Sequence, residues 1–366
     1  MRPPHPEYAG LKQALSQYED LMKKGGWPTL PPGPKMEKGD RGKRVAALRS
    51  RLMASGDMEA TGAADPELFD EALHQAVQRM QKRHGLEVDG IVGPATLAAL
   101  NVPVVDRIRQ IEVNLERWRW LPRSFGQRYL HVNIANFELD VIEDDRAVMT
   151  MRVVVGKKYR RTPVFAGTVK YLELNPYWNV PPSIAKKDIA RHALEDPQYL
   201  EKKNIRVFEN WAPGAREIDP CDVNWVRVRE EGCSFKLRQD PGPENALGTV
   251  KFMFPNKYDV YLHDTAHPEL FNKTKRSYSS GCVRVEKPID LATYLLQGNP
   301  EWTREHILAA VDSRETQKVS LPEPIPVLIL YFTAWVDGDG NLQFREDIYG
   351  RDEPLYQALT EGPPKS

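Results

Sequence analysis

The amino-acid sequence predicts an α+β protein of several domains, whose largest part is a mainly antiparallel β sandwich or barrel-like domain. Apolar residues recur at helical spacing up to about Trp120, and from Leu130 onward they alternate with a period of two. The alternating segments are short and separated by turns, which is typical of antiparallel sheets and not of a parallel α/β sheet. A chain of 366 residues also exceeds one typical hydrophobic core, so two or three domains are expected.

The N-terminal third is predicted to be helical. In its central part, the second helix is expected over residues 66–84, and Pro94 occupies a position that suits the first residue of the third helix. The predicted segments are an N-terminal helix with a proline-rich linker (1–37), a compact three-helix unit (38–102) and a connecting helix (103–124).

Residues 125–340 are predicted to form the β domain, and residues 341–366 a C-terminal tail. Residues 183–247 break the alternation with one helical piece and many polar turns, and so long a structureless connection would be unusual inside a compact domain. We interpret them as an inserted subdomain that caps the β domain; the alternative is a peripheral embellishment. Strands are expected at 130–134, 137–141, 148–155, 168–174, 249–254, 260–263 and 327–335.

The charge balance excludes some classes of partner. The chain carries 51 basic and 51 acidic residues, so no whole-protein field attracts it to nucleic acid or to an anionic membrane. No stretch approaches the roughly 20 apolar residues that span a bilayer. The first residues contain no apolar signal core, so either the protein is cytosolic or an export signal has been removed from this chain.

Three cysteines leave the redox state open. Cys221 and Cys233 are close in sequence and are the plausible disulfide pair, with Cys282 as the remaining thiol. The alternative is three reduced cysteines.

No metal site or cofactor is expected. Residues 337–341 (DGDGN) suggest a calcium loop, but Leu342 and Ile348 occupy the positions where an EF-hand has glycine and glutamate, so the segment is predicted to be a hairpin turn. His263, His267 and Cys282 lack the paired spacing of a zinc site.

His263 and Cys282 are the candidate catalytic pair. A neighbouring imidazole can take the proton of a thiol, whose pKa is ordinarily about 8.5, and so make the sulfur a strong nucleophile. The preceding Gly281 allows a substrate carbonyl to approach the backbone, and backbone N–H groups in such a turn can stabilise an oxyanion. Spacing alone also permits the plainer interpretation that Cys282 is a small buried hydrophobe.

Two stretches resemble known families. The run "QRMQKRHGLEVDGIVGPATLAAL" within residues 38–101 resembles the peptidoglycan-binding domain of cell-wall enzymes; the alternatives are a three-helix bundle without a ligand, or a spacer. The run "HDTAHPELFNKTKRSYSSGCVRV", from residue 263 to 285, resembles the catalytic signature of L,D-transpeptidases of the YkuD type.

In that signature His263, Ser279, Gly281 and Cys282 match the family pattern. Ser280 stands where the family has a second histidine, and Arg284 stands where many members have asparagine. The runs "SSGCVRV", "VVVGKKYRRTPVF" and "LNPYWNVPPSIAKKDI" resemble the large capped, YcbB-like branch, and the resemblance extends over about residues 40–350.

The resemblance implies an acyltransferase of peptidoglycan stem peptides. Cys282 attacks a tetrapeptide stem, D-alanine leaves, and a diamino-acid amine resolves the thioester into a 3→3 crosslink. The roles implied are base and acid for His263, a hydrogen bond to oxyanion or substrate for Tyr261, and substrate binding for Ser279, Ser280, Arg284, Trp178 and Asn179. Packing is the alternative for Tyr261, Trp178 and Asn179, and a structural or solvated arginine is the alternative for Arg284.

The same resemblance implies carbapenem binding, a monomer, cell-wall synthesis proteins as partners, and a location in the periplasm or cell envelope, although this chain shows no export signal. Alternatives with the same cysteine are an L,D-carboxypeptidase and a wall-protein amidase. From a different class, the chain could be a non-catalytic wall-binding module.

Overall fold

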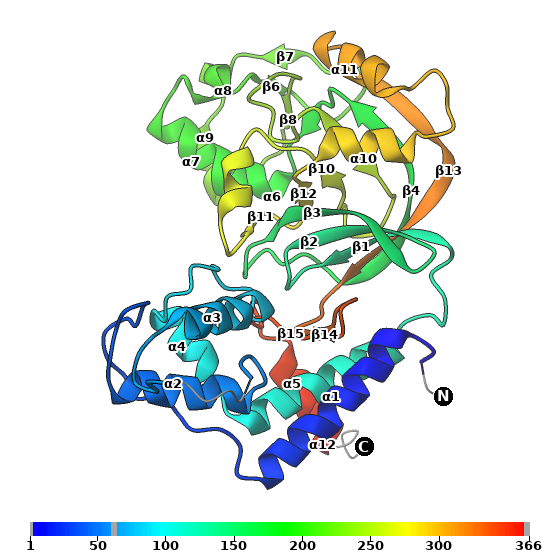
Figure 1. Cartoon of the computed structure of the whole chain (residues 1–366). Helices are drawn as coiled ribbons and strands as arrows, with labels where there is room; N and C mark the ends of the chain where they lie inside the picture. The colour runs from blue at the N-terminus through cyan, green and yellow to red at the C-terminus, as the bar shows by residue number, and fades with distance from the viewer. Residues whose placement is uncertain (1–2, 60–63, 362–366) are drawn as a thin grey trace. The chain divides into compact units, whose positions relative to one another are not determined.

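The computed structural model describes residues 3–59 and 64–361, which divide into two compact units (Figure 1). The first unit combines the chain up to Phe125 and residues 133–136 with the segment from Tyr331 onward, and the second combines residues 126–132 and 137–330. Helices dominate the first unit and a large sheet dominates the second, so the predicted α+β class is confirmed.

The first five helices described in this unit follow the predicted order, with one boundary that was wrong, and a further helix lies in the stretch predicted to be a C-terminal tail. The second helix of the three-helix unit was expected from residue 66 but begins at Glu71. The Asp70 carboxylate caps it by accepting a 2.9 Å hydrogen bond from Leu73 N, while Leu68 just before it makes a β-bridge with Arg41. The helices are α1 (Pro6–Lys23), α2 (Lys43–Ala54), α3 (Glu71–Arg83), α4 (Pro94–Leu100), α5 (Val104–Arg119) and α12 (Asp352–Glu361).

The C-terminal segment belongs to the first unit. β14 (Ala334–Val336) and β15 (Leu342–Phe344) pair antiparallel around residues 337–341, which confirms the predicted hairpin turn. The units divide at Leu330, whereas the sequence suggested a boundary at 340 and a tail beyond it. Contacts between this segment and α5 explain the difference, because they join residues more than 200 positions apart.

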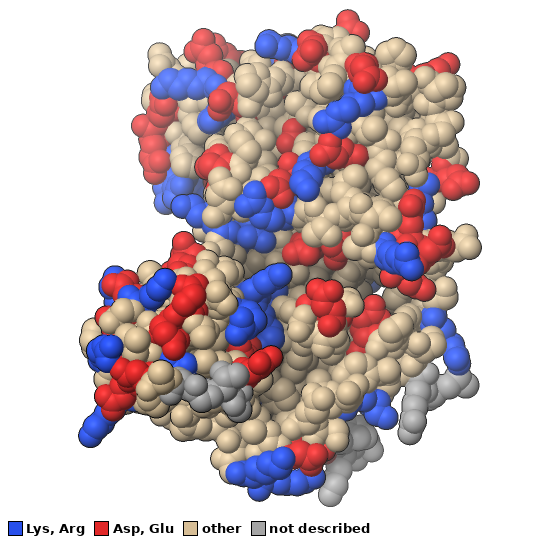
Figure 2. Space-filling model, in the orientation of Figure 1, with Lys and Arg blue, Asp and Glu red and all other residues tan. Residues whose placement is uncertain are grey.

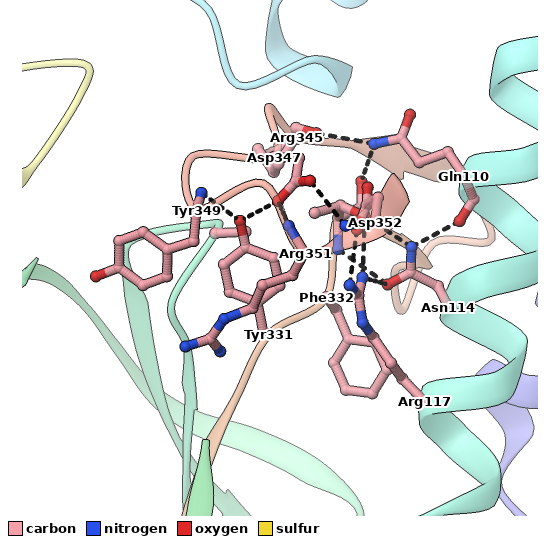
Figure 3. A network of polar contacts seen from close by, with 12 residues as sticks. Gln110, Asn114, Arg117, Tyr331, Phe332, Arg345, Asp347, Tyr349, Arg351 and Asp352 are labelled. Carbon is pink, nitrogen blue, oxygen red and sulfur yellow. Dashed lines mark hydrogen bonds and ion pairs between the residues drawn. The ribbon is translucent and has the colours of Figure 1, made fainter. Parts of the chain in front are cut away.

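A buried polar network holds the C-terminal segment to α5 (Figure 3). Thr333 Oγ1 is its centre: it accepts a 2.8 Å hydrogen bond from Asn114 Nδ2 and donates one of 2.8 Å to Asp352 Oδ2. Arg117 forms an ion pair of 2.7 Å with the same Asp352. Gln110 Nε2 donates to the carbonyls of Thr333 and Arg345. Since Thr333 is fully buried, each of these polar groups depends on the others for a partner.

We therefore expect Thr333→Val to destabilise the first unit by about 2 kcal/mol, because the Asn114 and Asp352 side chains lose a buried partner. The measurement is native-state hydrogen exchange at the amides of α5, with Thr274→Val as the control at an exposed threonine. Equal exchange in the two variants would contradict a structural role for the network.

The second unit is built on a nine-stranded sheet in the order β11-β3-β12-β10-β9-β4-β13-β1-β2. Most pairings are antiparallel as predicted, but β10–β12 and β11–β3 are parallel. The last strand was expected over 327–335 and instead runs from Gln317 to Leu330. The strands are β1 (Arg128–Asn133), β2 (Glu138–Glu143), β3 (Arg146–Gly156), β4 (Phe165–Leu174), β9 (Val250–Met253), β10 (Leu262–His263), β11 (Ser277–Ser279), β12 (Val283–Val285) and β13. The same unit also contains α10 (Pro288–Leu295), α11 (Arg304–Asp312) and the short η3 (Pro268–Asn272).

The segment interpreted as a capping insertion has a small core of its own. Its apolar residues, from Val180 to Leu237, pack together beside a four-stranded sheet in the order β5-β8-β6-β7. Its elements are β5 (Trp178–Asn179), α6 (Pro182–Ile184), η1 (Ala185–Ile189), α7 (Ala190–Glu195), α8 (Tyr199–Lys202), β6 (Ile205–Phe208), β7 (Glu217–Ile218), η2 (Pro220–Asp222), α9 (Trp225–Glu231) and β8 (Lys236–Gln239).

All three cysteines are free, so the suggested Cys221–Cys233 pairing is not formed in this structure. Cys221 is exposed beside Asp219, whereas the half-buried Cys233 donates its thiol proton toward the Phe235 carbonyl. The thiols therefore have separate local partners.

Acidic and basic side chains are both present at the surface. Lys or Arg and Asp or Glu side chains both occur over the face shown in Figure 2. None of the helices described in residues 3–59 and 64–361 is long and apolar enough to span a membrane. Over the same residues there is no group of three or more His, Cys, Asp or Glu side chains that could hold a metal ion.

Candidate active site

Strand pairing places His263 in a row of polar side chains. β10 pairs parallel with β12, which sets His263 opposite Arg284, and antiparallel with β9, which sets it opposite Lys251. Directly paired residues share a face of the sheet, so these three side chains project to one side. The paired residues one position earlier, Leu262 and Val283, are fully buried on the opposite side. The core therefore fixes which face carries the polar row.

Cys282 lies one position before β12, beside Tyr261. Val283 N donates a 3.1 Å hydrogen bond to the Tyr261 carbonyl. The half-buried Cys282 thiol contacts the Tyr261 hydroxyl and lies 3.8 Å from the Asp259 carbonyl oxygen. Removal from water raises the pKa of this thiol, although contact with Tyr261 and the charges of Lys251 and Arg284 oppose the rise.

His263 is buried and electrically neutral at ordinary pH. Burial, followed by the positive charges of Arg284 and Lys251, lowers its pKa from 6.5 to about 3, against the opposing effect of the Asp264 and Leu247 carbonyls. The Asp264 and Leu247 carbonyls lie near the ring, but its Nδ1 atom makes no well-formed hydrogen bond. The ring meets that of Tyr261 edge-on, with 5.6 Å between centroids. The imidazole is therefore neutral and keeps one nitrogen lone pair, but its lowered pKa makes it a weaker base than a free histidine.

The turn that carries Cys282 is fixed by side-chain hydrogen bonds. Ser279 Oγ donates to the Cys282 carbonyl at 2.6 Å and accepts from Gly281 N at 3.1 Å. Gly281 has a φ of +127°, a backbone conformation that other residues rarely adopt, and the space where its Cβ would point is nearly open. Because the Gly281 N–H is bonded to Ser279, this group serves the turn and is not a free oxyanion donor in this state.

Arg284 contributes a second unpartnered polar atom. Its Nη1 donates to Thr265 Oγ1 at 3.3 Å, and its buried Nε has no partner. In the second unit, whose residues are all described, the buried side-chain polar atoms without a partner are His263 Nδ1 and Arg284 Nε. These two atoms belong to residues paired with each other across β10 and β12. Buried polar atoms without a hydrogen-bond partner are unusual in folded proteins, so these two are candidates for a functional role.

The structure gathers most of the residues singled out from the sequence. These six residues lie in or next to β10, β11 and β12, or in the turn between β11 and β12: Cys282, Tyr261, His263, Arg284, Ser279 and Gly281. Trp178 joins them through a hydrogen bond with the Tyr261 side chain, and Ser280 is exposed and accepts a 2.8 Å hydrogen bond from Arg160. Asn179 is exposed in β5, where it pairs with Arg238. The described hydrogen bonds do not connect it to the other site residues. The described contacts also include no hydrogen bond between Cys282 Sγ and His263.

Two features of the site were missed from the sequence. Lys251 reaches the polar row only through the pairing of β9 with β10, which alternation in a short strand does not reveal. Thr162 is fully buried, accepts from Gly156 N at 2.9 Å and donates to the Gly281 carbonyl at 2.8 Å. The quoted run "VVVGKKYRRTPVF" contained Thr162, but nothing in its composition indicated contact with a turn 119 residues later.

A thiol next to one strand and an imidazole in the neighbouring strand are the two groups that thiol acyl-transfer enzymes use. Comparison with known proteins then identifies the family of each part. Residues 127–303 match the L,D-transpeptidase catalytic domain (YkuD), and residues 41–100 match the "Putative peptidoglycan binding domain". The chain thus carries a YkuD-type L,D-transpeptidase catalytic domain preceded by a peptidoglycan-binding domain.

Individual relatives are similar over different parts of the chain. A Haemophilus influenzae protein named "Putative L,D-transpeptidase" is 32% identical over 247 residues, which cover 68% of this chain and 49% of that protein. The Bacillus licheniformis N-acetylmuramoyl-L-alanine amidase CwlL is 45% identical over 65 residues, 18% of each protein. The chain therefore spans about half the length of the first relative and less than a fifth of the second.

Among solved structures, an L,D-transpeptidase (residues 123–326) from Xylanimonas cellulosilytica has 18% sequence identity and a TM-score of 0.25. The alignment covers 82% of this chain and 99% of that one.

The lowered pKa of His263 predicts an unusual pH profile for acylation of Cys282. Above pH 3 or so the imidazole stays neutral, so titration of His263 should produce no inflection in the rate between about pH 7.5 and pH 5. The measurement is the rate of carbapenem acylation against pH at constant ionic strength. A loss centred near pH 6.5 would contradict it, since that is the ordinary pKa of histidine.

Folding stability should also respond to pH, between about pH 6.5 and pH 3. The unfolded chain binds a proton at His263 near pH 6.5 and the folded chain only near pH 3, so this group lowers stability progressively as the pH falls between those values. Circular dichroism at each pH separates unfolding from a true kinetic effect.

Proposed function

We propose that this protein is a peptidoglycan L,D-transpeptidase that forms 3→3 crosslinks by acyl transfer through Cys282. The sulfur attacks the carbonyl of the third residue of a tetrapeptide stem, a carbon–sulfur bond forms, and the bond to the terminal D-alanine breaks. His263 takes the thiol proton and gives it to the departing amine of D-alanine. The side-chain amine of a diamino acid in a second stem then attacks the thioester, forms the new amide and returns a proton to the sulfur through His263.

The observation that carries the proposal is the pair of unpartnered buried atoms, His263 Nδ1 and Arg284 Nε, on adjacent strands beside the thiol. An imidazole nitrogen without a partner suits transient proton transfer. A guanidinium N–H without a partner suits a carboxylate, and the donor stem ends in one. A stem bound with its terminal carboxylate at Arg284 would bring its scissile carbonyl near Cys282.

The remaining site residues have supporting roles in this proposal. Tyr261, whose hydroxyl contacts the thiol, donates to the oxyanion or orients the sulfur. Ser279 and Gly281 shape the nucleophile turn, and Ser280, Trp178 and Asn179 line the donor groove. The independent core of the inserted segment supports assignment to the large capped branch of the family, with 183–247 as the cap.

Substrate and location follow from the same chemistry. Peptidoglycan lies outside the cytoplasm, so we propose a periplasmic or cell-envelope location, with stem peptides as substrates and the helical unit as a wall anchor. Carbapenems should acylate Cys282, because a strained lactam carbonyl presents the same electrophile to the thiol. We further propose a monomer that works with cell-wall synthesis proteins and needs no cofactor.

The test is intact-protein mass spectrometry and product analysis with a disaccharide-tetrapeptide. Release of D-alanine, a tripeptide acyl adduct and dimers joined at the two diamino acids would support the transpeptidase. D-alanine with tripeptide monomers alone would instead mean that water resolves the thioester, as in an L,D-carboxypeptidase. No adduct from either the tetrapeptide or a carbapenem on folded protein would leave a non-catalytic wall-binding module.

A further inference from the structure

One short loop holds the three residues that precede Cys282. Lys157 N donates to the Ser279 carbonyl at 3.0 Å, Arg160 Nη1 donates to Ser280 Oγ at 2.8 Å, and Thr162 Oγ1 donates to the Gly281 carbonyl at 2.8 Å. The loop of residues 156–162 therefore meets the nucleophile turn residue by residue. The contacts made by Lys157 N and by the Thr162 side chain lie within the sheet domain. The Arg160 side chain makes one contact more, outside the turn.

Arg160 also reaches the inserted segment. The same Nη1 atom that donates to Ser280 forms an ion pair with Asp188, and the Arg160 side chain is only 14% exposed. Asp188 lies in η1 (Ala185–Ile189), a single π-helical turn, and such turns are frequently found at functional sites. One nitrogen thus joins the inserted segment to the turn that presents Cys282.

The acceptor in this chain is a serine hydroxyl at a position where the family pattern has histidine. A hydroxyl can accept from a guanidinium N–H at any protonation state of its surroundings. Ser280 is exposed, so its contact with Arg160 depends on where Asp188 holds the guanidinium and not on packing around the serine.

We propose that Asp188, Arg160 and Ser280 form a latch through which the inserted cap sets the position of the Cys282 turn. Arg160 is a positioning residue: it touches neither the thiol nor the imidazole, and acts through Ser280. When η1 is in place, Asp188 orients Arg160 and the turn is held; when a ligand displaces η1, the guanidinium loses its orientation and the turn loosens. The predicted effect on acylation rests on the function proposed above, whereas the effect on thiol exposure does not.

The first experiment measures carbapenem acylation in Arg160→Gln, Asp188→Asn and the double variant of the full chain. Each single change should slow acylation roughly tenfold or more, since misplacement of a nucleophile by about 1 Å can cost 100-fold. The double variant should be no slower than the slower single variant, because both changes break one latch. Arg160→Lys should restore part of the rate, since both contacts of Arg160 come from a single nitrogen that an ammonium can mimic.

Matched controls remove a positive charge from the same two segments without touching the latch. Lys158→Gln lies in the loop and Lys187→Gln in η1, and both side chains are exposed. Each should acylate at the wild-type rate, which separates the latch from a general effect of charge.

The second experiment measures alkylation of Cys282 by iodoacetamide, with the exposed Cys221 as the reference in the same molecule. A loosened turn releases the thiol from Tyr261 and from burial, so alkylation of Cys282 should rise about tenfold while that of Cys221 stays constant. A rise in alkylation together with a fall in acylation distinguishes mispositioning from unfolding, which would also expose Cys233.

Unchanged alkylation and acylation in Asp188→Asn would overturn the latch, as would single-variant effects that add in the double variant. If the wild-type chain is not acylated at all, the proposed function fails while the alkylation comparison still decides the latch.

Discussion

Cys282→Ala should abolish covalent acylation by carbapenem and by tetrapeptide, and should lower D-alanine release on the order of 10⁴-fold or more, because no other group at the site can form the thioester. Cys282→Ser should recover little, since a hydroxyl beside a neutral imidazole is a far weaker nucleophile than a thiol. Intact-protein mass spectrometry measures the adduct, and chromatography measures D-alanine.

The other two cysteines provide the matched controls. Cys221 is exposed and Cys233 is half-buried in the inserted segment, and neither contacts the polar row. Cys221→Ala and Cys233→Ala should therefore acylate normally. An adduct that persists in Cys282→Ala and disappears in either control would refute the assignment of the nucleophile.

Gly156→Ala should both destabilise the second unit and remove acylation. A Cβ at this position would lie 2.1 Å from the Arg160 carbonyl oxygen and 2.7 Å from Thr162 N, and backbone atoms cannot move aside as a flexible side chain can. The 156–162 loop must then shift, and the contacts it makes with Ser279, Ser280 and Gly281 shift with it. We expect a loss of roughly 3 kcal/mol in unfolding free energy and at least 100-fold slower acylation.

Gly338→Ala is the matched control for that change. Gly338 has no positive φ and no heavy atom within 4 Å of the position its Cβ would occupy, so the same substitution adds a methyl group without a clash. Denaturant unfolding and carbapenem acylation of both variants test the prediction. Similar behaviour of the two alanine variants would mean that the 156–162 loop tolerates displacement and does not fix the conformation of the Cys282 turn.

Local sequence patterns predicted the features that depend on neighbouring residues. Alternation identified the strand that ends at His263, and apolar spacing identified the first five helices of the first unit. The start of α3 was missed because a capping aspartate, Asp70, outweighs the apolar pattern that continues before it.

Contacts between distant segments were not predictable in the same way. The parallel pairing of β10 with β12 leaves no trace in two- and three-residue strands, yet it places Arg284 opposite His263. The attachment of Thr333 to α5 and of Thr162 to Gly281 joins residues 219 and 119 positions apart. Single hydrogen bonds over such separations leave no periodic pattern in the sequence. The residues could therefore be identified from the sequence, but their contacts could not.

The neutral state of the thiol has a consequence for its durability in an oxidising environment. The thiolate is the form of cysteine that attacks peroxides and disulfides. A thiol that stays protonated is therefore oxidised slowly. Burial raises the pKa of Cys282, and the unprotonated imidazole of His263 supplies no cation to stabilise a resting thiolate. In an oxidising environment a sulfur held in this protonated state is therefore oxidised more slowly than a resting thiolate would be.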